Sequence, residues 1–185
     1  MMEQLNHQSR RDRFGSKINR DHSPVLMFGL PWLSIMLGSL TPLLPIIAPA
    51  PILPPMGYLL LLSWRMLRPG SLALWAGFPL GMFDDMFSGQ PLGSGILLFS
   101  LTMIALDLLE LRFPWRRFWQ NWLIAGVFML AYLVAAALVS GARVEMLHLT
   151  LLLPQLLLCL TVFPIAVALA GFLDWVRLLR VSRTG

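Results

Sequence analysis

The chain has 185 residues, of which 57% are hydrophobic and 12% are charged, and its formal net charge is +5. A soluble domain of this size leaves much of its surface in water and carries about 25% charged residues, so the composition excludes an ordinary soluble fold. The apolar excess indicates an all-α integral membrane protein. Because the basic residues fall between apolar runs, the positive charge indicates membrane topology rather than nucleic-acid binding.

Residues 1–23 are polar and basic, and they are predicted to form a disordered cytoplasmic tail. Residues 24–176 are predicted to form a bundle of about six transmembrane helices, since roughly 20 apolar residues cross a bilayer. The expected spans are residues 24–40, 54–67, 71–87, 92–109, 121–140 and 146–175. Six prolines in residues 41–55 predict a stiff connector. Residues 177–185 form a second basic tail.

The distribution of Lys and Arg predicts the orientation of the bundle. With six spans, Arg143 is the one basic residue of the 14 that falls on the outer face. Because basic flanks are retained in the cytoplasm, both termini are expected to be cytoplasmic. Arg112, Arg116 and Arg117 are expected in a cytoplasmic loop, where they set topology or touch anionic lipid.

Three ionisable residues lie near the inner ends of the expected spans. Arg65, near the end of the second expected span, can snorkel to the headgroups. Asp107 is expected close to Arg112. Asp174 lies three residues before Arg177, a helical spacing that allows a surface ion pair.

The sequence offers no catalytic constellation. An aspartyl protease needs two carboxylates that share a proton, and about 22 Å of helix would separate Asp85 from Asp107. The strip Gly93-Ser94-Gly95 has the wrong spacing for a rhomboid-type serine nucleophile. One Cys and no clustered His predict no metal site, and no cofactor is expected.

Small residues recur every four positions in the third expected span, at Ala73, Gly77 and Gly81. This spacing predicts a helix face that another helix can approach closely. Packing within the bundle is the favoured interpretation, and contact with a partner's transmembrane segment is the alternative.

Residues 81–93 resemble the signature of the rod shape-determining protein MreD family. That signature reads, loosely, Gly, three apolar residues, Asp, two apolar residues, Ser, Gly, two variable residues, Leu, Gly. The matching positions are Gly81, Asp85, Ser88, Gly89, Leu92 and Gly93. Asp84 replaces an apolar residue of the pattern, so either Asp84 or Asp85 could be the important carboxylate. The resemblance covers about residues 24–181.

This resemblance implies a bundle similar to the substrate-binding subunits of energy-coupling-factor transporters. It also implies a non-catalytic scaffold of the bacterial inner membrane that maintains rod shape within the cell-wall elongation complex. The implied partners are MreC and, through MreC, the MreB filament and the peptidoglycan synthases. The alternative is a small-molecule-binding subunit of a transporter, which the scarcity of polar groups in the last two spans disfavours.

Overall fold

A computed structural model of the chain describes residues 24–43, 54–113, 118–139 and 146–177. Its described residues form six α-helices and two short 3-10 turns, with no strand among them. The elements are α1 (Pro24–Ser39), η1 (Thr41–Leu43), α2 (Met56–Leu67), η2 (Leu74–Ala76), α3 (Gly77–Phe87), α4 (Ser94–Arg112), α5 (Phe118–Val139) and α6 (Met146–Arg177). This architecture confirms the predicted all-α class.

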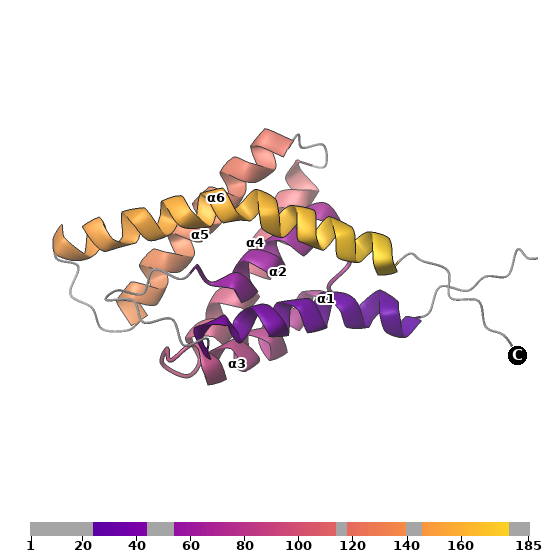
Figure 1. Cartoon of the computed structure of the whole chain (residues 1–185), viewed down its shortest axis with the longest axis horizontal. Helices are drawn as coiled ribbons and strands as arrows, with labels where there is room; N and C mark the ends of the chain where they lie inside the picture. The colour runs from indigo at the N-terminus through magenta and orange to yellow at the C-terminus, as the bar shows by residue number, and fades with distance from the viewer. Residues whose placement is uncertain (1–23, 44–53, 114–117, 140–145, 178–185) are drawn as a thin grey trace, which may run out of the picture.

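The longest helix, α6, runs along the long axis of the molecule, with α1 beside it in the opposite direction (Figure 1). The start of α1 and the end of α6 therefore lie at the same end (Figure 1). α2 packs against α1, α6 and α5, while α3 packs chiefly against α4. Nine consecutive residues of α2, residues 57–65, are buried. A helix that is apolar on all sides belongs in an interior, so α2 forms the centre of the bundle.

Three helices are long and apolar enough to cross a bilayer: α4, α5 and the Leu152–Val176 part of α6. They support the prediction of a membrane protein. α2 has 12 residues and α3 has 11, so each is only about 16–18 Å long, against a hydrocarbon core of about 30 Å. The count of six spans therefore stays a prediction.

The third expected span is wrong in its start, because the α-helix begins at Gly77 rather than near residue 71. Gly70 adopts φ +84°, a left-handed conformation, and Ala73 has extended backbone before η2. The predicted stripe of small residues is accordingly broken: Ala73 precedes the helix and does not share its face.

The two glycines of that stripe lie against α4. A Cβ at Gly77 would be 2.9 Å from Cα of Ser100, and a Cβ at Gly81 would run into the carbonyl oxygen of Gly95. A Cβ at Gly95 would in turn meet the carbonyl oxygen of Gly81 at 2.9 Å. The Gly77 and Gly81 face is thus covered by a helix of the same chain. Absent side chains allow this approach, as in other tightly packed membrane helices.

Because backbone cannot yield as a flexible side chain can, Gly81→Ala should destabilise the fold by about 1–3 kcal/mol. The measurement is the fraction of detergent-extracted protein that stays monodisperse after heating. Gly29→Ala is the matched control, because a Cβ there meets nothing within 4 Å. Equal loss of stability in the two variants would contradict the close α3–α4 packing.

Candidate functional site

The family-like strip folds into the joint between α3 and α4, and Asp85 is the residue that holds it together. Its carboxylate accepts hydrogen bonds from the backbone N–H of Gly93 (2.8 Å), Gly95 (2.6 Å) and Ile96 (3.2 Å). The hydroxyl of Ser94 lies 3.2 Å from Oδ1 of the same group. Asp85 is only 4% exposed, so a carboxylate of α3 satisfies the first N–H groups of α4 inside the protein.

The start of α4 has no side-chain hydrogen-bond acceptor of its own, so it needs one from elsewhere in the chain. The first N–H groups of a helix lack partners within the helix, and a side-chain oxygen at the N-cap usually accepts from them. Here the N-cap residue is Gly93, which has no side chain and adopts φ +100°. The charge of Asp85 also suits the positive end of the α4 dipole. Asp85 therefore acts as a helix cap supplied by the neighbouring helix.

The other residues of the strip shape the turn. Ser88 ends α3, with its N–H donating to the carbonyl oxygen of Asp84 at 2.9 Å. Gly89 has φ +68°, which L side chains rarely adopt. Leu92 is exposed. Each of these positions serves the geometry of the reversal, except Leu92, for which the described structure offers no packing reason.

Asp84 points away from α4. It is buried, with the Ser39 hydroxyl beside it, and a Cβ at Gly57 would lie 3.2 Å from its Oδ1. Asp84 thus faces the crossing of α1 and α2, where a Cβ at Gly38 would meet the backbone N of Gly57 at 3.0 Å. Adjacent helical residues do not share a face, and the two carboxylates accordingly serve different helix pairs.

Further buried polar groups lie at the same end of α2. The Tyr58 and Thr102 hydroxyls are 2.7 Å apart, and the Tyr58 ring stacks on Tyr132 with centroids 4.2 Å apart. These contacts join α2 to α4 and α5. The hydroxyls are satisfied by one another, as buried polar groups require.

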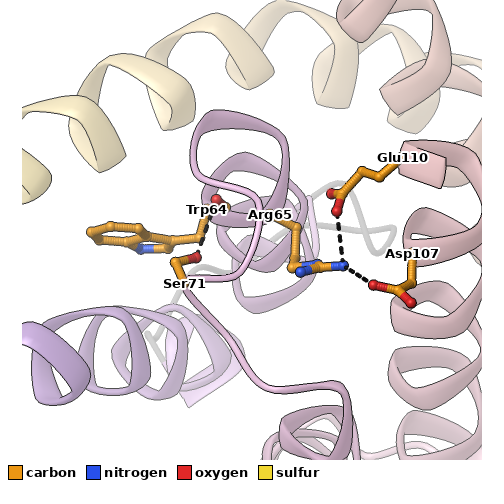
Figure 2. A network of polar contacts seen from close by, with 5 residues as sticks. All are labelled: Trp64, Arg65, Ser71, Asp107 and Glu110. Carbon is orange, nitrogen blue, oxygen red and sulfur yellow. Dashed lines mark hydrogen bonds and ion pairs between the residues drawn. The ribbon is translucent and has the colours of Figure 1, made fainter. Parts of the chain in front are cut away.

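A charge network occupies the opposite end of α2. Figure 2 shows Arg65 extending toward two carboxylates of α4. Its Nη2 lies 3.2 Å from Oδ1 of Asp107 and 3.3 Å from Oε2 of Glu110. Arg65 is only 3% exposed. The predicted snorkelling of Arg65 is therefore wrong, because the carboxylates give its guanidinium a partner inside the bundle.

A second ion pair ties the C-cap residue of α2 to α6. Nε of Arg68 lies 2.9 Å from Oδ2 of Asp174. The ion pairs that the structure shows for Asp107 and Asp174 thus reach to α2, whereas the sequence placed these carboxylates beside Arg112 and Arg177. Arg112 is exposed in the last turn of α4. Arg116 and Arg117 lie outside the described residues.

Sequence reasoning missed the role of Arg65, which is the most buried charged side chain of these pairs. Its partners follow it by 42 and 45 residues, so no local spacing pattern reveals them. The available signal was the position itself: a single arginine in an otherwise apolar helix, with two carboxylates at the matching depth of a later span.

Asp85→Asn should destabilise the fold by about 1–3 kcal/mol, because an amide nitrogen would face N–H donors that need an acceptor. Asp84→Asn is the matched control for charge removal one residue away, and it should cost less because its neighbour is a hydroxyl, which can also accept. Thermal unfolding in detergent measures both. An Asp85→Asn variant as stable as the wild type would contradict the capping role.

Arg65→Gln should also destabilise the fold, by about 1–3 kcal/mol. The cost is below that of breaking a fully buried pair, because the Asp107 carboxylate reaches solvent. Arg112→Gln is the control, because Arg112 is exposed on the same helix as Asp107 and Glu110. This variant should leave the unfolding temperature nearly unchanged. If the two variants unfolded at the same temperature, the contacts of Arg65 with Asp107 and Glu110 would not contribute to stability.

Comparison with known proteins adds the family. A family model described as rod shape-determining protein MreD matches residues 24–175. No curated protein and no solved structure matches the chain, so the predicted likeness to transporter substrate-binding subunits stays a prediction. The match covers every described helix except the end of α6 and includes the whole Asp85 joint. The chain belongs to the MreD family of rod shape-determining proteins, and its apolar helices are those of a membrane protein.

Proposed function

We propose that this protein is a non-catalytic scaffold of the bacterial inner membrane, within the complex that builds the lateral cell wall. In this role it associates with MreC and, through MreC, with MreB and the peptidoglycan synthases. Family membership supports a role in rod shape determination, and the finer assignment to these partners is our proposal. The distribution of basic residues supports a cytoplasmic location for both termini.

The scaffold assignment rests on the hydrogen bonds that the Asp85 carboxylate accepts. The strip that resembles the family signature contains one carboxylate matching its pattern, and three backbone N–H groups donate to that carboxylate. A general base or nucleophile must instead reach a substrate. The motif therefore maintains the shape of a helix pair, which is what a scaffold must offer to its partners.

The remaining described carboxylates favour the same assignment. Arg65 lies against Asp107 and Glu110, and Arg68 against Asp174. These groups sit at the opposite end of α2 from Tyr58 and Asp84, so the carboxylates of the two ends do not converge on a single site. The described polar groups join helices to one another, and this arrangement favours a scaffold over the transporter alternative.

Depletion of the protein in its rod-shaped host should convert the cells to spheres, as measured by the cell aspect ratio in phase-contrast images. A plasmid copy of the wild type should restore rods, and an Asp85→Asn copy should restore them less well in proportion to its lower membrane abundance. The Asp84→Asn copy is the matched control. Persistent rods after complete depletion would overturn the role in cell shape.

Co-purification tests the partner separately. Tagged protein extracted from host membranes in mild detergent should recover MreC, read by mass spectrometry against an untagged strain. Loss of rod shape without recovery of MreC would keep the family role and refute the partner assignment.

A further inference from the structure

The outward face of α4 is a continuous apolar strip. Its large exposed residues follow one another at intervals of four, three, four and three positions. They are Leu97, Leu101, Ile104, Leu108 and Leu111. This is the spacing of a and d positions in a heptad, which lets a second helix pack along the seam. Exposed strips also occur on α5 and α6, so the spacing alone does not distinguish a partner from lipid.

A charge distinguishes α4. Asp107 adjoins this strip, and its side chain is 53% exposed. One of its oxygens lies against Arg65, but the same guanidinium nitrogen also serves Glu110. One arginine nitrogen therefore faces two carboxylates. The exposed side of the Asp107 carboxylate flanks the apolar strip, where a cation brought by a partner helix would pair with it.

Neither α5 nor α6, the other two membrane-length helices described, presents a half-exposed carboxylate. The sequence of α5 contains no Asp, Glu, Lys or Arg. In α6 the one acidic residue, Asp174, is 7% exposed and pairs with Arg68. Among the described faces, the half-exposed carboxylate is therefore specific to α4.

We propose that the α4 face docks one transmembrane helix of a partner, with apolar residues at intervals of three and four and a Lys or Arg that pairs with Asp107. The basic residue would lie about one turn from the Arg112 end of α4, the end expected in the cytoplasm. In a heptad, Asp107 occupies the position flanking Leu108, where charged pairs select the partner and its orientation. This inference rests on the proposed association with membrane-anchored MreC and assigns it a surface.

Site-specific photo-crosslinking in membranes tests the surface. A photoreactive amino acid replaces Leu101 in the full chain, co-expressed with MreC, and the controls replace Val127 on α5 and Ile165 on α6. The three side chains are similarly exposed, at 62%, 66% and 66%. The adduct with MreC at Leu101 should exceed each control at least fivefold. Equal or stronger adducts at Val127 or Ile165, with MreC still co-purifying, would overturn the surface and leave the proposed function intact.

A double-mutant cycle tests the charge. Asp107→Asn should lower the Leu101 adduct by about two- to fivefold, the range of a partly exposed ion pair. Neutralising the partner's basic residue at the matching depth should produce the same loss, and the two losses should not add in the double variant. Additive losses, or none, would overturn the pairing. If wild-type protein recovers no MreC at all, the proposed association itself fails, a result distinct from either of these.

Discussion

The N-terminus of α4 has backbone N–H groups without helical partners, and buried groups of this kind need an acceptor within the protein. The N-cap residue is Gly93, so the acceptor has to come from another part of the chain, and Asp85 provides it. This requirement fixes much of the surrounding structure. α3 must end close enough for Asp85 to reach, and the turn must reverse sharply through left-handed Gly89. The helices can approach this closely because Gly81 faces Gly95.

α2 joins the α3–α4 pair to the rest of the bundle. It is too short to span a bilayer alone and is buried on every side, so its polar residues must be satisfied by neighbours. Near one end, Tyr58 contacts Thr102 of α4, and toward the other, Arg65 contacts Asp107 of α4. α4 is thus held by α2 at two depths and by α3 at its start. This triple attachment leaves one face of α4 turned outward.

Sequence reasoning was most successful where the chemistry is local. Apolar composition indicated the membrane class, and the four-residue interval placed Gly77 and Gly81 on one face. The start of α3 was wrong because propensity and hydropathy do not show that the backbone stays extended through Ala73. The inner ion pairs were missed because helix spacing rules compare residues on one helix, whereas Arg68 and Asp174 are 106 positions apart. Pairings of this kind depend on which helices become neighbours.

The adjacent carboxylates show how one departure from the family pattern fits the fold. Position 85 requires a short, charged acceptor, because three N–H groups converge there. Position 84 faces the α1–α2 crossing, where an apolar residue would only need to fill space. In this chain Asp84 lies beside the hydroxyl of Ser39, so a polar residue at that position has a polar neighbour. Asp85, which stands where the family pattern has its aspartate, thus performs a role that a side chain without an acceptor cannot take.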